Sequence, residues 1–235
     1  LDALARELGI EANELRFKSL VRPEQMPFDN IAKRHFDSGD YPEALRRAID
    51  AIGFDAVRAR QRQAEADGRR IGIGFAMYSE QAGHGTSVYA AWGIPFVPGH
   101  EQCFARFTPD GALELRIGAH SHGQGLETTL SQVAHSILGM PHDRIRLVHG
   151  DTAETPYSTG TWGSRCMIMS GGAVAAACEQ LAERALRIGA SLLQAGREDV
   201  RLENGWIVSP SGRIAIADVA RTWYRRPQDL PPDAD

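Results

Sequence analysis

Two glycine-bearing segments carry side chains that can bind a charged ligand. The first, residues 118–125, reads Gly-Ala-His-Ser-His-Gly-Gln-Gly and precedes an apolar pattern typical of a helix. Glycines let the backbone approach a ligand closely, and the free N–H groups at a helix start attract anions. Gln124 can donate an amide hydrogen bond, and Thr128 and Thr129 add hydroxyls. The segment predicts an anion site, although such strand-to-helix turns are also common as purely structural elements.

The second segment, residues 158–165, reads Ser-Thr-Gly-Thr-Trp-Gly-Ser-Arg and precedes a long alanine-rich helical pattern. Arg165 can form a two-pronged contact with a phosphate, and the alternative is a Ser/Thr/Gly loop that caps a helix. Two such loops in one domain favour an extended anionic ligand, such as a dinucleotide pyrophosphate, held between two helix ends. Neither loop carries the GxGxxG fingerprint or a GK[ST] sequence, which argues against Rossmann and P-loop sites.

Two weaker candidates involve acidic and imidazole side chains. Asp151, in Gly150-Asp151-Thr152, either caps a turn after a strand or bonds to ligand N–H and hydroxyl groups. A metal site built from His120, His122, His149 and Asp151 is an alternative hypothesis, but no HExxH or similar ligand spacing supports it. Ser164 lacks the GxSxG elbow of nucleophilic serines, so the sequence gives little support to nucleophilic catalysis.

The elements that must position these loops follow from hydrophobic spacing and turn residues. We expect a helical lead-in over residues 1–69 and an α/β domain over residues 70–235. Expected helices are 1–8, 11–21, 41–52, 54–66, 126–138, 167–193 and 217–224. Expected strands are 71–79, 102–108, 112–117 and 144–148, with a hairpin over 200–208, a long loop over 83–99 and a frayed tail over 227–235. The fold class is α+β with α/β layering, in which helices pack on a mixed sheet.

Composition excludes several classes of protein. The 235 residues carry a net charge of −4, which is not the basic footprint of a nucleic-acid-binding protein. No apolar run approaches the roughly 20 residues of a membrane span. Cys103, Cys166 and Cys178 are not in CxxC spacing, so free thiols in a reducing, cytoplasmic compartment are expected. The chain starts at Leu1 within an expected helix, which indicates a segment of a longer chain.

Several of these motifs, in this order, resemble the large subunits of molybdenum hydroxylases, the family of xanthine dehydrogenase, aldehyde oxidase and carbon monoxide dehydrogenase. Residues 122–129 resemble the GQGxxT segment, and residues 150–152 with 159–165 resemble GDT…TGTxGSR. Residues 36–41 resemble YDSGDY, and residues 71–74 resemble the strand that opens the first molybdopterin-binding domain. Residues 14–16 resemble ELRxxN, whose Asn is replaced here. The similarity covers nearly the whole chain and is greatest to carbon monoxide dehydrogenase-type subunits.

The resemblance implies a molybdopterin cytosine dinucleotide cofactor. Gln124 would bond to an oxo group on molybdenum, outside the metal's own ligands, and the metal would be held by the pterin and not by histidines. The implied cofactor-binding residues are Gly123, Gln124, Gly125, Thr128, Thr129, Asp151, Thr152, Thr161, Gly163, Ser164 and Arg165. Such an oxidoreductase would hydroxylate an aldehyde, an N-heterocycle or CO with water-derived oxygen.

The resemblance also implies partners and limits. Electrons would leave through iron–sulfur clusters and FAD on companion subunits or domains, and the other domains of the large subunit would complete the site around a small-molecule substrate. The family's catalytic Glu lies in a GxGE-type motif that does not occur here, and the substrate-selecting loop is also missing. No residue of this chain is therefore assigned to catalysis, and the chain alone is expected to be inactive. Alternatives are a non-catalytic nucleotide- or phosphate-binding module and a His/Asp metal-dependent hydrolase.

Overall fold

The computed structural model describes residues 1–83, 85–91, 93, 99–232 and 234. The chain forms two compact units, Leu1–Ser79 and Glu80–Asp235. The boundary expected between residues 69 and 70 was that of a ligand-binding domain and not of a compact unit, so it stays a prediction. No helix among the described residues is long and apolar enough to cross a bilayer.

The first unit is mainly helical, as predicted. Its helices are α1 (Asp2–Leu8), α2 (Ala12–Ser19), α3 (Tyr41–Ile52) and α4 (Phe54–Ala66), with a 3-10 turn η1 (Pro23–Gln25) and a small antiparallel pair, β1 (Phe28–Asp29) and β2 (His35–Phe36). Asp40 caps α3 by accepting the N–H of Glu43. Gly53, with φ of 61°, ends α3 in the left-handed conformation that glycine adopts without strain. Both bounds of α3 and of α4 agree with the prediction.

The predicted strand over residues 71–79 is wrong. This segment runs extended, but it pairs with no strand of the described chain. Side chains take the place of a ladder: Gln61 Nε2 donates to the Ile71 carbonyl at 2.7 Å, and Arg16 Nη2 donates to the Phe75 carbonyl at 2.7 Å. The alternating Ile and Phe pattern therefore reports an extended segment bound by helical side chains.

The second unit is built on a three-stranded mixed sheet in the order β3-β4-β5. Its strands are β3 (Cys103–Phe107), β4 (Leu113–Ile117) and β5 (Ile145–Val148); β3 and β4 are antiparallel, and β4 and β5 are parallel. The turn between β3 and β4 needs Gly111, which has φ of 81°, and a Cβ there would lie 2.8 Å from the Ala217 carbonyl oxygen. All three strands were predicted from their patterns.

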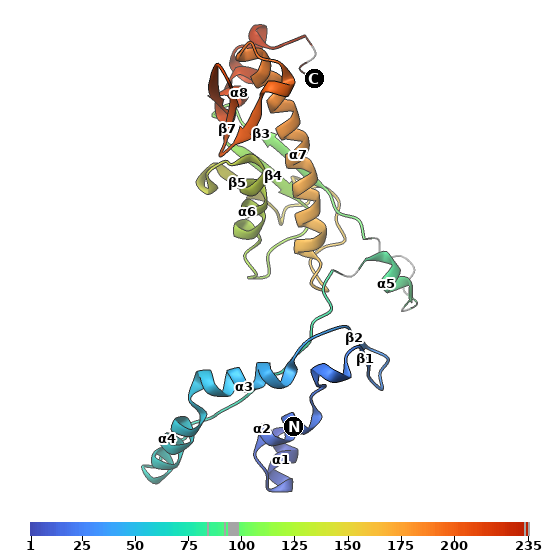
Figure 1. Ribbon diagram of the computed structural model, residues 1–235, viewed down its shortest axis with the longest axis vertical. Helices are drawn as coiled ribbons and strands as arrows, with labels where there is room; N and C mark the ends of the chain where they lie inside the picture. Colours follow the sequence, from blue (N-terminus) through green and yellow to red (C-terminus); the bar gives the residue numbers. More distant parts are fainter. Residues whose placement is uncertain (84, 92, 94–98, 233, 235) are drawn as a thin grey trace. The chain divides into compact units, whose positions relative to one another are not determined.

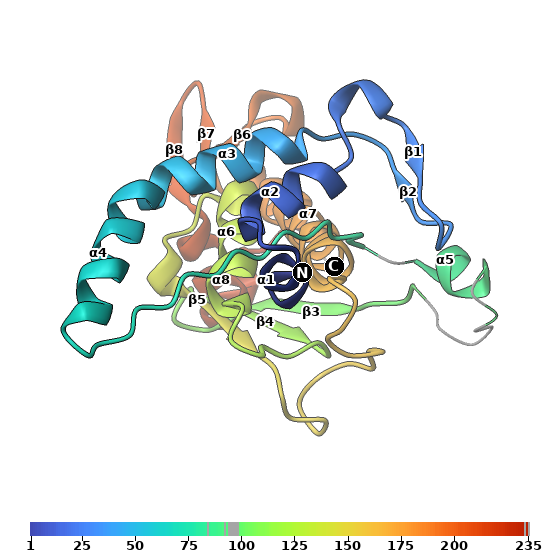
Figure 2. The same ribbon diagram turned by 90° about the horizontal axis from the view of Figure 1, so that it is seen from below.

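Two helices, α6 (Leu126–Leu138) and α7 (Cys166–Leu192), pack against one another on one face of this sheet (Figure 2). Their apolar stripes and the sheet form the core, whose fully buried members include Leu113, Leu115, Ile117, Leu130, Leu138 and Val174. A short helix, α5 (Thr86–Ala91), occupies part of the predicted loop over 83–99; the rest of that prediction includes residues outside the described ones.

A second, antiparallel sheet of β6 (Arg201–Glu203), β7 (Trp206–Ser209) and β8 (Gly212–Ala215) follows α7, and α8 (Ile216–Arg225) comes after it. The predicted hairpin is confirmed at Asn204 and Gly205, whose φ values are 47° and 78°. The third strand was not predicted. Three 3-10 turns complete the unit: η2 (His142–Arg144), η3 (Arg197–Asp199) and η4 (Pro227–Asp229). The predicted α+β class is confirmed.

Candidate functional site

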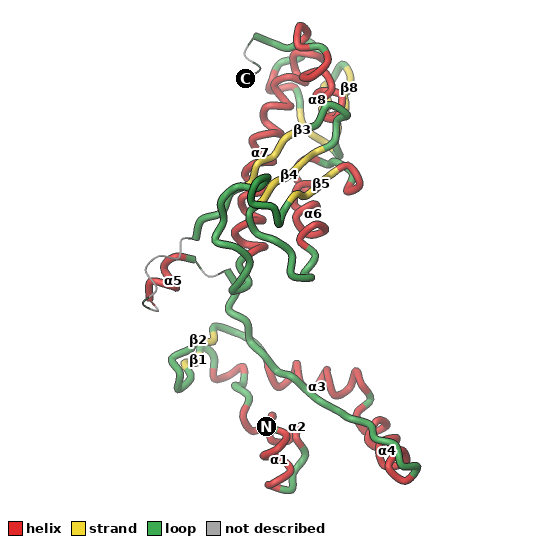
Figure 3. Tube along the Cα trace, turned by 180° about the vertical axis from the view of Figure 1, so that it is seen from behind, coloured by secondary structure: helices red, strands yellow, loops and turns green. Residues whose placement is uncertain are grey.

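The two glycine-bearing loops lie at the same end of the mixed sheet. One joins the end of β4 to the start of α6, and the other follows the end of β5 and leads into α7 (Figures 1 and 3). Because β4 and β5 are parallel, their carboxyl ends meet at one edge, where ligands bind in many α/β sheets. The fold thus assembles the predicted loops and both helix starts on one side of the unit.

A threonine hydroxyl joins the two loops directly. Thr161 Oγ1 accepts the backbone N–H of His120 at 2.9 Å and donates to the carbonyl oxygen of the same residue at 2.6 Å. One hydroxyl can serve both roles because it carries a donor and two acceptor positions. The second loop is thereby fixed to a single peptide position of the first.

A glycine at the end of β4 permits this close approach. A Cβ on Gly118 would lie 2.5 Å from the Pro156 carbonyl oxygen and 3.0 Å from the Ser158 nitrogen. The requirement is steric, because Gly118 is not among the residues with positive φ. Any larger residue would push apart the segments that carry the two loops.

The first loop is folded on itself around Gln124. The side-chain oxygen of Gln124 accepts the N–H of His122, and Gly123 and Gly125 have φ values of 105° and 74°. A Cβ on either glycine would meet nothing within 4 Å, so these glycines serve conformation and leave the backbone open. Thr129 bonds by its N–H and its hydroxyl to the Gly125 carbonyl, at 3.0 and 3.2 Å.

The start of α6 already holds a negative charge. The carboxylate of Glu127 accepts its own backbone N–H and pairs with His149 Nε2 at 2.9 Å, and these contacts lower its pKa. The first turn of α7, by contrast, contains no acidic residue. By charge alone, the amino terminus of α7 is the better seat for an anion.

The second loop adopts a backbone that side chains rarely accept. Gly163 and Ser164 are consecutive left-handed residues with φ of 54° and 51°. Ser164 is held from two sides, since its hydroxyl bonds to a carboxylate oxygen of Glu80 and its carbonyl accepts the N–H of Gly83 at 3.1 Å. Such conformations persist where the surroundings over-determine them, and they are frequent at ligand sites.

Arg165 lies beneath this loop, with its side chain only 1% exposed. Nη1 donates to Glu101 Oε2 at 3.0 Å and to the Gly160 carbonyl at 2.7 Å, and Nη2 donates to the His100 carbonyl at 2.9 Å. The predicted fork to a phosphate has no counterpart in these contacts. Both terminal nitrogens bind this unit's own oxygens, and a contact of Arg165 with a ligand stays a prediction.

Asp151 and Thr152 lie in the turn after β5. Asp151 Oδ1 accepts the N–H of Ala153 at 2.8 Å, and the Asp151 carbonyl accepts both the N–H and the hydroxyl of Thr155, at 3.0 and 2.8 Å. The structural alternative for Asp151, that it caps a turn, is therefore realised. Its predicted contact with a ligand stays a prediction.

The histidines do not gather into a metal site. His120 and His122 approach each other at 3.0 Å between their Nε2 atoms, while His149 pairs with Glu127. Over the described ranges of the chain, no three His, Cys, Asp or Glu side chains form a group that could hold a metal ion. The hydrolase alternative therefore lacks its ligand set.

The donor set fits a phosphate-bearing organic ligand. Around Gly123, Gly125 and Gly160 a Cβ would meet nothing within 4 Å, so a ligand can approach the backbone there, although the N–H groups of Gly123 and Gly160 already donate to Ser121 and Ser158. Two buried polar atoms beside the loops, Thr159 Oγ1 and His149 Nδ1, have no hydrogen-bond partner among the residues that the structure describes. Uncrowded backbone, hydroxyls and unpartnered polar atoms are the groups that bind phosphate and heterocycle oxygens or nitrogens.

Glu101 is the residue at this site that sequence reasoning missed. It precedes β3 as a lone carboxylate outside every motif, and its side chain is only 2% exposed. It receives Arg165 and also the hydroxyl of Ser158 at 2.7 Å. The only available signal was the rule that a buried arginine needs an acidic partner, and that rule does not say which acid.

Comparison with known proteins agrees with this geometry. A family model described as a molybdopterin cofactor-binding domain matches residues 47–233. The chain is 34% identical over 233 residues to the carbon monoxide dehydrogenase large chain of Hydrogenophaga pseudoflava. The matched region covers 97% of this chain and 29% of that protein. The chain is 30% identical over 227 residues to the nicotine 6-hydroxylase large subunit of Paenarthrobacter nicotinovorans, covering 95% and 28%.

Solved structures give the same result. Quinoline 2-oxidoreductase from Pseudomonas putida 86 matches with a TM-score of 0.72 and 30% identity, over 100% of this chain and 30% of that one. The Cu,Mo-CO dehydrogenase in its carbon monoxide reduced state matches with a TM-score of 0.68 and 31% identity, over 99% and 30%. The chain thus spans less than a third of the length of these relatives.

Proposed function

Because this chain belongs to the molybdopterin cofactor-binding domain family, we propose that it supplies one wall of the cofactor site in a molybdenum-dependent oxidoreductase. The observation that carries the proposal is the Thr161 hydroxyl bound to both backbone groups of His120, which unites the two predicted loops. A site shared between two loops and two helix starts suits an extended cofactor with several phosphate oxygens.

The loops divide the work of binding. The open backbone at Gly123 and Gly125 and the amide of Gln124 would contact the pterin and the molybdenum end, with Thr128 and Thr129 beside them. The loop around Thr161, Gly163 and Ser164, at the start of α7, would hold the phosphates, and Arg165 would act by shaping that loop. Asp151 and Thr152 would meet the more distant part of the ligand.

When bound, the cofactor supplies the oxygen-transfer and two-electron chemistry, which protein side chains cannot perform. This chain's own residues bind, orient and shield. The side-chain amide of Gln124 has a fixed orientation because its oxygen accepts the N–H of His122. Its NH2 group would then donate to the cofactor. The proposed substrate is an aldehyde, an N-heterocycle or CO, as the family resemblance implies; the names of two relatives, carbon monoxide dehydrogenase and nicotine 6-hydroxylase, support CO and an N-heterocycle.

The finer assignments belong to the same proposal. We infer the cytosine dinucleotide form of the cofactor, companion iron–sulfur and FAD subunits or domains, a cytoplasmic location and a cofactor domain that begins near residue 70. Relatives called large chains and subunits support companion subunits. The three free cysteines support a reducing compartment.

The test is cofactor analysis of the full-length subunit that contains this chain, expressed together with its companion subunits in a host that makes the molybdenum cofactor. We expect stoichiometric molybdenum by mass spectrometry of the metal, a fluorescent pterin after oxidation and CMP after acid hydrolysis. Gln124→Ala is expected to lower the molybdenum content. Protein that contains zinc, or binds simple nucleotides but no molybdenum, would instead support one of the two alternatives. Release of a nucleotide other than CMP would reject the cytosine form alone.

A further inference from the structure

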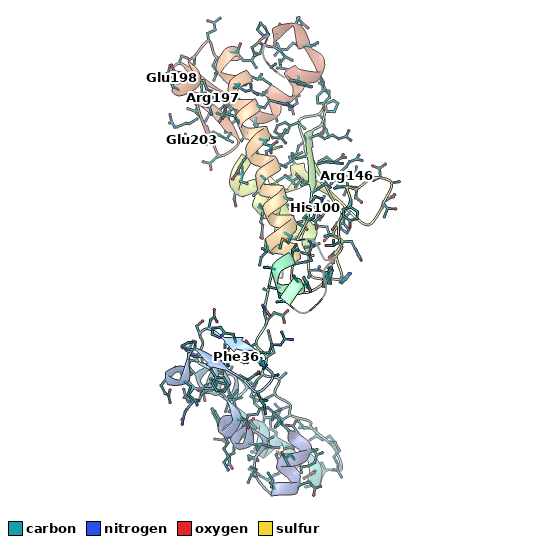
Figure 4. The ribbon with its side chains drawn as sticks, turned by 90° about the vertical axis from the view of Figure 1, so that its right-hand side faces the viewer. Phe36, His100, Arg146, Arg197, Glu198 and Glu203 are labelled. Carbon is teal, nitrogen blue, oxygen red and sulfur yellow. The ribbon has the colours of Figure 1, made fainter. Side chains whose placement is uncertain are left out.

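A buried ionic network supports the second loop from below. Glu101 and Arg165 are 2% and 1% exposed, and they pair at 3.0 Å. Both oxygens of Glu101 are engaged, since Oε2 also accepts the Ser158 hydroxyl at 2.7 Å and Oε1 accepts the Gln102 N–H at 3.3 Å. Figure 4 marks the neighbouring His100, whose carbonyl accepts Arg165.

Two arms of this network end on the backbone of the loop, at Gly160. Arg165 Nη1 donates to the Gly160 carbonyl at 2.7 Å, and Ser158 Oγ accepts the Gly160 N–H at 2.9 Å. Gly160 is therefore held through both of its backbone groups, and Glu101 binds the two side chains that hold it. The next residue is Thr161, which joins the loop to His120.

A buried ion pair is a poor device for stability alone. The cost of removing two charges from water offsets most of their attraction, and well-packed apolar residues often serve folding equally well. What such a pair supplies is a defined geometry, provided that its remaining donors and acceptors are satisfied. The engaged oxygens of Glu101 meet that condition.

We propose that Glu101 is a positioning residue, which acts through Arg165 and Ser158 to hold residues 158–165 in the shape that receives the cofactor. The inference rests on the proposed function, and it assigns to Glu101 no contact with the ligand. Loss of an outer partner of this kind typically costs about 10- to 100-fold in affinity at cofactor sites with metals.

The test compares three variants of the same full-length subunit, expressed with its companion subunits in a host that makes the molybdenum cofactor. Glu101→Gln removes the charge. Glu101→Leu combined with Arg165→Met replaces the pair by apolar groups. Glu183→Gln is the matched control, because it breaks the exposed pair with Arg197, which lies at the other end of this unit from His100 (Figure 4). The readouts are thermal stability, hydrogen exchange at amides 158–165 and molybdenum content.

We expect exchange in the loop to accelerate about tenfold or more in Glu101→Gln, and molybdenum content to fall by a similar factor. The double variant is expected to regain thermal stability but neither the protected loop nor the molybdenum, which a merely structural pair would not produce. Glu183→Gln should match the wild type throughout.

Wild-type molybdenum and loop exchange in the double variant would overturn the proposal and leave the cofactor assignment standing. Should Glu101→Gln fail to fold, Ser158→Ala replaces it, since it removes only the hydroxyl between Glu101 and Gly160; faster exchange at Gly160 then supports the proposal, and unchanged exchange overturns it. A wild-type protein without molybdenum would reject the proposed function, and the exchange measurement would then decide alone whether Glu101 positions the loop.

Discussion

The hydroxyl of Thr161 binds both backbone groups of His120, accepting its N–H at 2.9 Å and donating to its carbonyl at 2.6 Å. Neither residue lies in a regular element, so this contact fixes one loop against another. The Sγ of Cys166 donates to the same oxygen at 3.4 Å, which ties the contact to the first residue of α7. Three segments therefore depend on one side-chain oxygen.

Thr161→Val should separate the loops while keeping the shape of the side chain. The loss of the hydroxyl is expected to cost about 1 kcal/mol of unfolding free energy, because exposed backbone groups regain water. Molybdenum content should fall further than stability suggests. Calorimetry and metal analysis provide the measurements. Thr155→Val, which removes a bond inside a single turn, is the control; equal molybdenum in both variants would count against a bridging role.

Gly118→Ala should destabilise the protein by about 1–3 kcal/mol, the usual cost of overpacking. The added methyl would meet the Pro156 carbonyl oxygen at 2.5 Å, which is backbone and cannot rotate away. Gly172→Ala in α7 is the control: its Cβ would meet nothing within 4 Å, so alanine should stabilise the helix slightly. Denaturant unfolding measures both. A neutral Gly118→Ala would show that the segments can move apart freely.

Two of the thiols should be inert in the native protein. Burial raises the pKa of Cys103 to about 12, aided by the charge of Glu101, and burial also raises that of Cys178 to about 12. The thiolate is the reactive form, so little of it is present near neutral pH. Iodoacetamide at pH 8 should label both slowly, and unfolded protein rapidly, as followed by peptide mass spectrometry. Fast labelling of Cys178 in folded protein would contradict the burial.

Glu127 should titrate below the ordinary glutamate pKa of 4.5, because its own backbone N–H and then His149 stabilise the carboxylate. A lowered folded-state pKa contributes stability above the pKa of the unfolded chain, and that contribution is lost as the pH falls through the folded value. Stability should therefore decline in acid below pH 4.5, and Glu127→Gln should flatten this decline.

Carboxyl NMR resolves the causes of that shift. His149→Phe should raise the Glu127 pKa but leave it below the ordinary value, since the backbone contact remains. Glu183, whose pKa is lowered by its hydrogen bond with Arg197, serves as the reference carboxylate. If His149→Phe left the Glu127 pKa unchanged, the imidazole of His149 would not be a cause of the lowered value.

The sequence predicted most helices and strands of the second unit, though not α5 or β8, because each predicted element carries its own local signal. Leu126–Leu138 was predicted to the residue from an apolar stripe and Gly139, and the β3–β4 turn from Asp110 and Gly111. The strand expected over 71–79 is absent because an alternating pattern indicates an extended segment with one side partly buried, and does not show that the segment pairs with another strand. That both loops share one end of the sheet follows from the parallel pairing of β4 and β5, for which the sequence has no local mark.

The network beneath the loop lies beyond sequence reasoning for a similar reason. Arg165 was assigned to a phosphate from its motif, whereas its partners are carbonyl oxygens and a carboxylate from before β3. Only the folded chain brings these groups together. The binding residues themselves remain predictions, which the cofactor measurements above address.

Glu101 and Arg165 are 64 residues apart in the chain, so Glu101 is synthesised well before Arg165. Before Arg165 is available, burial of the unpaired Glu101 carboxylate is unfavourable. We therefore expect the start of β3 to stay exposed to water until then. The second loop can thus take its final shape only after Arg165, at the start of α7, has been synthesised. The shape of residues 158–165 therefore depends on a contact between two distant parts of the chain, and not on local sequence alone.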